Sequence, residues 1–219
     1  MDSLRVMLFG IPGFLLGIMV HESCHALAAS KLGDPTARKM GRISLNPLRH
    51  FDLLGALFYA FTALAWHRGF GWAKPVLINP HNFRDYRRDF ALSSIAGPAS
   101  NMVQAFVWAF LLRAFYLAAP SIPNSIAPSL SLVIYLGVWI NVLLAVFNMI
   151  PIPPLDGSRV LAFMLPERYA HVIDRMEHSG IGMVIIFGLL FIFPGALSAV
   201  LGTVIEPVLT FFLRIAGPG

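Results

Sequence analysis

Apolar residues fill long runs of this chain, and polar residues are confined to shorter stretches between them. The runs predict helices near residues 4–30, 90–118, 129–149, 180–194 and 196–214, with a shorter apolar run at 52–66. A helix rises about 1.5 Å per residue, so a run of about 18 or more apolar residues can cross the roughly 30 Å of hydrocarbon in a bilayer. The pattern predicts an all-α polytopic membrane protein with about five transmembrane helices.

The charged loops indicate how these helices cross the bilayer. Most of the 16 basic residues lie in the loops 31–49, 67–89 and 157–179, which the positive-inside rule places together in the cytoplasm. Segment 52–66, which is short for a span, would then enter and leave on one side as a re-entrant short helix. Segments 38–47 and 71–80 are partly β-prone and end in Asn-Pro, so we expect short β-hairpin-like loops there that contact an extended peptide.

Composition supports a membrane protein and excludes several other classes. The chain of 219 residues is 57% hydrophobic and 12% charged, which is far from the balance of a soluble domain. We expect one domain over 1–219 without a fused soluble module, and a lipid bilayer as its surroundings. The net charge of +5 does not indicate nucleic acid, because the basic residues flank apolar segments. The lone Cys24 excludes an intramolecular disulfide, and no feature specifies an oligomeric state.

Residues 21–25 read His-Glu-Ser-Cys-His within the first predicted helix. Side chains four residues apart lie on the same helix face, so His21 and His25 can bind one metal ion. Glu22 beside them can take a proton from a water molecule without binding the metal. The alternative is a polar cluster at a helix end that faces the interface. Ionisable groups on an apolar helix are costly, which favours a metal site.

A catalytic zinc needs a third protein ligand, and acidic residues outside the polar loops are few. Asp156 follows three prolines within 148–157, which break the helix and present a carboxylate at membrane depth. Glu206 is expected to be structural, through a basic partner or an interface position, and Cys24 to serve helix packing. The remaining histidines fall in polar loops and are expected to be solvated: His50, His67, His81, His171 and His178.

Three motifs occur in order along the chain: HESCH at 21–25, AGPASN at 96–101 and NMIPIPPLDG at 148–157. Together they resemble the site-2 protease family of intramembrane zinc metalloproteases, in its compact prokaryotic branch. The resemblance implies that His21, His25 and Asp156 bind one zinc ion per chain and that Glu22 is the catalytic glutamate. It implies that Asn148 holds the substrate strand or assists the oxyanion, although a helix cap before the prolines is an equal alternative. For the glycine of AGPASN, helix packing outweighs a chemical role.

The resemblance further implies hydrolysis of a peptide bond in or beside a transmembrane helix of a membrane-protein substrate. It places the protein in a prokaryotic plasma membrane, and the charge bias of the loops places the active site toward the cytoplasmic side. A non-proteolytic membrane zinc-binding protein or transporter is the alternative, and Glu22 argues against it because a site that only binds zinc needs no general base. Prenyl-protein endopeptidases are similar at HESCH but use a downstream glutamate, and the chain has no Gly-x-Ser-Gly element of an intramembrane serine protease.

Overall fold

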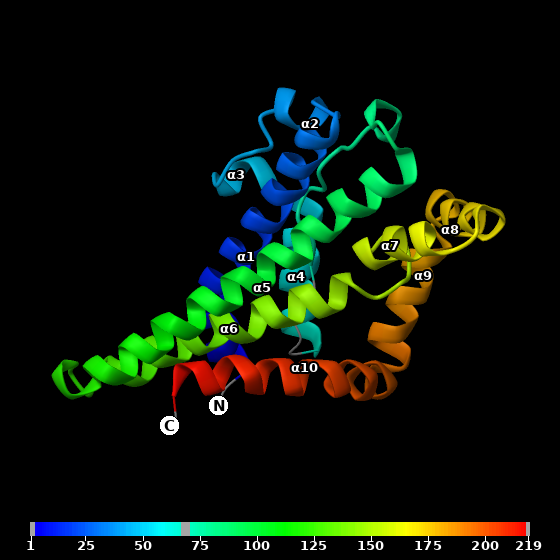
Figure 1. Cartoon of the computed structure of the whole chain (residues 1–219). Helices are drawn as coiled ribbons and strands as arrows, with labels where there is room; N and C mark the ends of the chain where they lie inside the picture. The colour runs from blue at the N-terminus through cyan, green and yellow to red at the C-terminus, as the bar shows by residue number, and fades with distance from the viewer. Residues whose placement is uncertain (1–2, 67–70, 218–219) are drawn as a thin grey trace.

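The chain folds almost entirely into helices, as a computed structural model describing residues 3–66 and 71–217 shows (Figure 1). The helices are α1 (Ser3–Leu32), α2 (Thr36–Lys39), α3 (Pro47–His50), α4 (Leu53–Trp66), α5 (Tyr86–Ala118), α6 (Ala127–Asn148), α7 (Asp156–Met164), α8 (Glu167–Ser179), α9 (Ile181–Phe187) and α10 (Pro194–Ala216). Short 3₁₀ turns lie at Pro80–Asn82 (η1) and Ala119–Ser121 (η2), and a π-helical turn at Gly188–Ile192 (η3) continues α9.

Within the described residues, four helices are long and apolar enough to cross a membrane: α1, α5, α6 and α10. The prediction of an all-α polytopic protein is confirmed to that extent. The predicted helix 180–194 corresponds to α9 and η3, which pass the same test only together with α8, across a bend of 74°. Gly180 ends α8 in the left-handed conformation at φ 71°, which is a common helix stop.

The centre of the molecule is the contact between α1, α5 and α6, which lie against one another (Figure 1). A Cβ atom on Gly13 would lie 2.9 Å from the Cα atom of Gly137, so only glycine permits this crossing of α1 and α6. Ala105 of α5 and Val142 of α6 are fully buried in the core that Phe212 of α10 completes. Small residues thus bring α1 close to the two helices that line the site.

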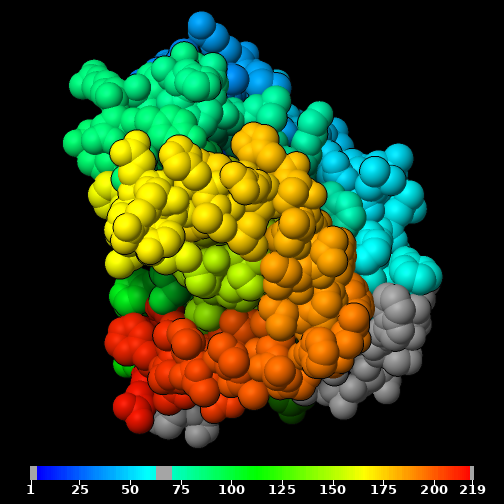
Figure 2. All heavy atoms as spheres, turned by 90° about the vertical axis from the view of Figure 1, so that its right-hand side faces the viewer, coloured from blue at the N-terminus to red at the C-terminus, as the bar shows by residue number. Residues whose placement is uncertain are grey.

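A recess opens on the face formed by α8, α9 and α10. Figure 2 shows atoms of α5 and α6 at its floor, between the atoms of α7 and α8 above and those of α10 below. An apolar pocket of about 500 Å³ lies between α5, α6 and α10, and it is lined in part by Pro98, Met102, Met149 and Val204.

The prediction of β-hairpin-like loops is not confirmed, because the structure assigns no strand to residues 38–47 or 71–80. The Asn-Pro pairs begin helical turns instead. Asn46 accepts a hydrogen bond from Leu48 N at 3.0 Å and Pro47 opens α3, while Asn79 does the same for His81 N at 3.2 Å before η1. An asparagine cap followed by proline suits the start of a helix, which overrides the β preference of the residues before it.

Residues 71–79 have no regular structure and run back alongside α4. The ring of Trp72 lies 5.4 Å from that of Phe58, and Lys74 N donates to His50 O at 2.9 Å. Asn79 N donates to Asp34 Oδ2 at 2.7 Å, just after the end of α1. The chain therefore returns to the end of α4 at which α3 lies (Figure 1).

The basic loop 157–179 is also helical. Arg159 of α7 forms ion pairs with Asp174, at 3.0 Å, and with Glu177, both on α8, and its guanidinium lies 4.4 Å from the ring centre of Phe90 on α5. This cluster joins α7 to α5 and α8. It fixes the helix whose first residue is Asp156.

Candidate metal centre

Three potential ligand atoms converge where α7 begins against α1. The Nε2 atoms of His21 and His25 are 2.9 Å apart, and each lies close to Asp156 Oδ2, at 3.2 and 3.3 Å respectively. Both histidines are buried, with 6% and 7% of their surface exposed. Among the described residues these three form a group able to hold a metal ion.

Hydrogen bonds on the far side of each imidazole determine where its proton lies. His25 Nδ1 is 2.7 Å from Ser93 O, and a carbonyl can only accept, so His25 carries its proton on Nδ1. His21 Nδ1 is 2.6 Å from Asn101 Oδ1, and Asn101 is completely buried.

A chain of buried amides establishes that Asn101 presents its oxygen to His21. Asn141 Nδ2 donates to Gly137 O at 2.9 Å, so Asn141 Oδ1 accepts from Asn101 Nδ2 at 3.0 Å. Asn101 Nδ2 also donates to Gly17 O at 3.1 Å. The remaining atom, Asn101 Oδ1, must accept from His21 Nδ1, so the neutral imidazoles both present Nε2 lone pairs to Asp156.

This donor set fits zinc. Two nitrogen lone pairs and a carboxylate that face one another at about 3 Å repel unless a cation lies between them. Tetrahedral zinc with ligands at about 2.0–2.2 Å requires roughly 3.3 Å between ligand atoms. The two distances to Asp156 agree with that value, and the 2.9 Å between the two Nε2 atoms is shorter. Three protein ligands leave a fourth position open, as in catalytic zinc sites.

Glycines bring the surrounding helices within reach of these ligands. A Cβ atom on Gly97 of α5 would lie 2.3 Å from His25 Nε2 and 2.7 Å from His21 Cε1, so α5 meets both rings only because that residue has no side chain. A Cβ atom on Gly157 would lie 2.2 Å from Met149 O, so the start of α7 packs directly on the end of α6. The predicted packing role of Gly97 agrees with this contact. AGPASN lies inside α5, which begins at Tyr86 with Asp85 as its cap.

Glu22 is half-buried on α1, next to His21. Its Oε2 accepts a hydrogen bond from Val76 N at 3.0 Å, so the backbone of segment 71–79 contacts this carboxylate directly. Asn148 is the last residue of α6, and its Nδ2 donates to Leu144 O at 2.9 Å. No hydrogen bond joins Asn148 to the three candidate ligands within the described part of the chain.

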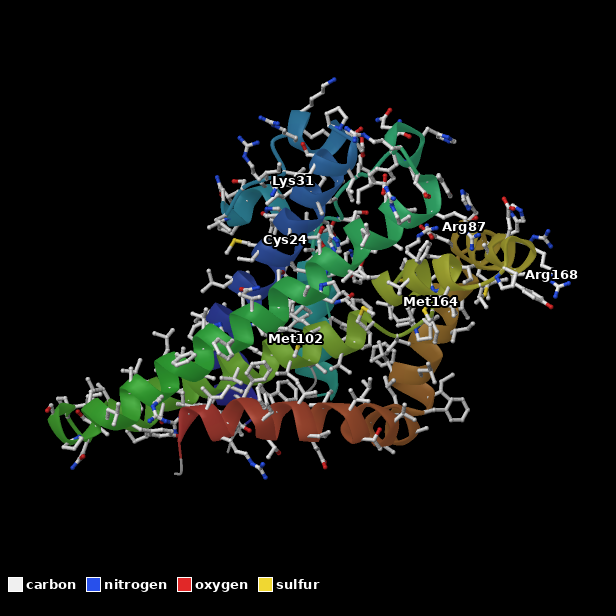
Figure 3. All side chains as sticks on the ribbon, in the orientation of Figure 1. Cys24, Lys31, Arg87, Met102, Met164 and Arg168 are labelled. Atoms are coloured by element: carbon white, nitrogen blue, oxygen red, sulfur yellow. The ribbon has the colours of Figure 1, made fainter. Side chains whose placement is uncertain are left out.

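The other residues considered from sequence lie away from the site. Cys24 points away from α5, as Figure 3 shows, and it is outside the candidate metal group. Glu206 is exposed on α10, His171 and His178 are exposed on α8, and His67 lies outside the described residues. His50 was expected to be solvated, but it is 2% exposed, and its Nε2 donates to Ser44 O at 2.7 Å. Its burial follows from the packing of residues 42–50 on α1.

Sequence reasoning missed Asn101 as the residue that orients His21. The available signal was an amide side chain within an apolar helix, repeated at Gln104 and at Asn141 of the next helix. Such groups are costly in an apolar setting unless they bond to one another or to a site. The second partner, Ser93 O, is a backbone atom, so residue type could not reveal it.

Comparisons with known proteins show the family to which this chain belongs. The model of the family described as Peptidase family M50 matches residues 116–193. Putative zinc metalloprotease YwhC of Bacillus subtilis is 34% identical over 191 residues, which cover 87% of this chain and 83% of its own length. The chain belongs to peptidase family M50. The site-2 protease resemblance and the prediction of a metallopeptidase are thereby confirmed.

Further relatives come from other prokaryotes. Putative zinc metalloprotease Rip2 of Mycolicibacterium smegmatis is 30% identical over 181 residues, which cover 83% of this chain and 66% of that protein. Putative zinc metalloprotease MJ0611 of Methanocaldococcus jannaschii is 41% identical over 68 residues, which cover 31% of each chain. No solved structure gives a significant match to this M50 member.

Proposed function

We propose that this M50 peptidase is a zinc metalloprotease that hydrolyses a peptide bond in or beside a transmembrane segment of a membrane-protein substrate. The observation that carries the proposal is the convergence of His21, His25 and Asp156 beside Glu22, in a chain with four helices apolar enough to cross a membrane. The relatives' names, which all specify a zinc metalloprotease, support the choice of metal.

The three converging side chains would hold one zinc ion, with His21 and His25 oriented by Asn101 and by Ser93 O. When bound, zinc polarises the scissile carbonyl and makes a coordinated water more acidic. The burial of both histidines limits how much bulk water can compete with them for the metal.

Glu22 acts as general base and then as general acid. Its carboxylate takes one proton from the attacking water while the water oxygen bonds to the carbonyl carbon. When the C–N bond breaks, Glu22 passes that proton to the leaving nitrogen, so the immediate products are a carboxylic acid and an amine; the proton of the acid then moves to the amine, which gives a carboxylate and an ammonium group. Asn148 lies at the end of α6, where Met149 packs on Gly157, and its amide can hold the substrate carbonyl if it releases Leu144 O.

Segment 71–79 is the candidate contact for an unwound substrate strand. A helical peptide bond is shielded by its own hydrogen bonds, so the substrate must adopt an extended form before cleavage. The backbone of Val76 already contacts Glu22, and Leu77 beside it is 57% exposed. A strand that pairs with this segment would therefore lie next to the catalytic carboxylate.

The arrangement of α4 also supports placement of the site toward the cytoplasmic face. Helix α4 begins, and segment 71–79 returns, at the end of the molecule where the basic residues of 31–49 lie. A re-entrant element requires this arrangement. His21 and His25 lie closer to that end of α1 than to its N-terminus. The apolar pocket between α5, α6 and α10 includes Pro98, next to Gly97, so an apolar substrate helix seated there would lie near the metal ligands.

The test is cleavage of single-span membrane proteins by the purified protein in detergent or liposomes, with zinc content measured for each variant. We expect Glu22→Gln to keep zinc and lose cleavage, and Asp156→Ala to lose both. Glu206→Gln is the matched control, because Glu206 is also an acidic residue on an apolar helix but is exposed and remote from the site.

The outcomes separate the parts of the proposal. Full activity in Glu22→Gln would refute the assigned base, and normal zinc content in Asp156→Ala would refute the third ligand. Stoichiometric zinc in the wild type without cleavage of any substrate in the panel would favour a membrane zinc-binding protein.

A further inference from the structure

Arg42 is a buried cation outside the metal site, and only 4% of its surface is exposed. No carboxylate of the described residues lies within ion-pair distance of its guanidinium. Three backbone carbonyls accept its hydrogen bonds instead: Arg49 O, Lys74 O at 3.2 Å and Pro75 O at 2.8 Å. A buried charge is costly unless it is paired, so the position of its counter-charge needs an explanation.

The peptide group between Pro75 and Val76 connects Arg42 to a counter-charge, the carboxylate of Glu22. The carbonyl oxygen of this group accepts from Arg42 Nη2 at 2.8 Å, and its N–H donates to Glu22 Oε2 at 3.0 Å. One peptide group is therefore bonded to a cation on one side and to an anion on the other. Each bond polarises the peptide dipole in the direction that strengthens the other bond.

A second set of bonds connects the same elements to the metal-binding helix. Ser23 Oγ on α1 donates to Ser44 O at 2.8 Å, and His50 Nε2 donates to the same oxygen at 2.7 Å. Lys74 N donates to His50 O at 2.9 Å. This path leaves α1 at Ser23, passes through residues 44–50 to Lys74, and returns to α1 at Glu22.

We propose that Arg42 is a positioning residue for Glu22, which it orients and balances electrostatically through the peptide group 75–76. The proposal rests on the proposed function of Glu22 as the base. The hydrogen bonds of Arg42 go to backbone carbonyls and not to the candidate metal ligands. It holds Val76 N–H on one carboxylate oxygen of Glu22, which leaves the other oxygen free for the water.

Arg42→Met tests this role, because methionine fills much of the space and cannot donate a hydrogen bond. Loss of a residue that orients a catalytic group typically costs about 10- to 100-fold in activity. We expect a loss of this size in kcat, with KM and zinc content close to those of the wild type. Arg42→Lys should recover part of kcat, since an ammonium group can bond to some of the three carbonyls.

Arg49→Met is the matched control. Arg49 lies in the same segment and also donates to a backbone carbonyl, Gly41 O at 3.2 Å, but it does not contact the peptide group 75–76. Its own carbonyl stays available to Arg42 in the variant. We expect kcat for Arg49→Met within about twofold of the wild type, against the 10- to 100-fold loss at Arg42.

Hydrogen exchange gives a readout that does not depend on activity. Val76 N–H should be protected in the wild type, and Arg42→Met and Glu22→Ala should each increase its exchange, whereas Arg49→Met should not. Exchange resolved to residues 74–78 by mass spectrometry measures this directly, and Pro75 contributes no amide hydrogen.

Several results would overturn the proposal. The proposal fails if Arg42→Met keeps the wild-type kcat, if its loss is confined to KM or zinc content, or if the exchange of Val76 N–H is unaltered in it. It also fails if Arg42→Lys lowers the thermal unfolding midpoint as much as Arg42→Met does and recovers no kcat. Full activity in Glu22→Gln would instead refute the proposed function, so the two failures are distinguishable.

Discussion

Asn101→Leu tests whether the amide chain prepares His21 for metal binding. Leucine has the same branching at Cγ as asparagine, although it is larger, and it cannot accept from His21 Nδ1, which lies 2.6 Å from Asn101 Oδ1. Without that acceptor, the imidazole proton can move to Nε2, where it blocks the metal. The ring also loses the contact that aims it at Asp156.

The expected cost comes from one buried hydrogen bond to a metal ligand. Loss of such a partner lowers metal affinity by about 10- to 100-fold, which corresponds to about 1.4–2.7 kcal/mol. Folding stability should fall as well, because Asn141 Oδ1 loses its donor and Gly17 O keeps, of its two side-chain donors, Gln104 Nε2 at 3.4 Å.

Zinc affinity in detergent, measured by competition with a chromophoric chelator at fixed pH, checks the expectation. Asn141→Leu is the control, because it breaks the same amide chain one step further from the metal and leaves Asn101 bonded to Gly17 O. Its zinc affinity should change by no more than a few-fold. Equal losses in the two variants, or none in Asn101→Leu, would refute the reasoning.

Three further predictions concern packing and pH. Gly97→Ala should abolish stoichiometric zinc binding, measured by metal analysis, because the new Cβ would lie 2.3 Å from His25 Nε2; Gly188→Ala, with nothing within 4 Å, should leave zinc unchanged. Burial raises the pKa of Asp34, but side-chain and backbone donors outweigh it and hold this pKa below its ordinary value. The thermal stability of the wild type relative to Asp34→Asn should therefore persist above about pH 4 and disappear as the pH falls through the lowered pKa, as thermal scans from pH 3 to 7 can show. Arg159→Met should lower the unfolding midpoint by an amount equivalent to about 1–3 kcal/mol, because two carboxylates on α8 lose their partner. The same scan of an Arg175→Met control should show little change, since Arg175 is exposed.

The local part of the candidate site could be predicted from the sequence. His21 and His25 share a helix face because of the helical repeat alone, so any helix through residues 21–25 brings them together. Asp156 could be proposed by elimination, because few acidic residues lie outside the polar loops and prolines before it exclude a regular helix. The long apolar runs likewise predicted α1, α5, α6 and α10, since length and composition suffice for such helices.

Other features depended on contacts between distant segments. The β preference of residues 71–80 did not produce a strand, because Arg42, Asp34 and Glu22 bond to the backbone there in place of a partner strand. In residues 38–47, Ser44 O accepts from the side chains of Ser23 and His50 instead. The basic loop 157–179 became α7 and α8 because Arg159 of α7 packs on Phe90 of α5 and α8 packs on α7.

The sequence by itself determined that an apolar chain carries a His-Glu-x-x-His helix and a distant aspartate, because helical spacing and composition are local properties. Only the tertiary structure decided how those groups are prepared for chemistry. Asn101 and Ser93 O orient the histidines from α5, and Val76 N–H contacts Glu22 from a segment 54 residues away. Hydrogen bonds of this kind join atoms that are distant in the chain, and several are backbone atoms that every residue type shares.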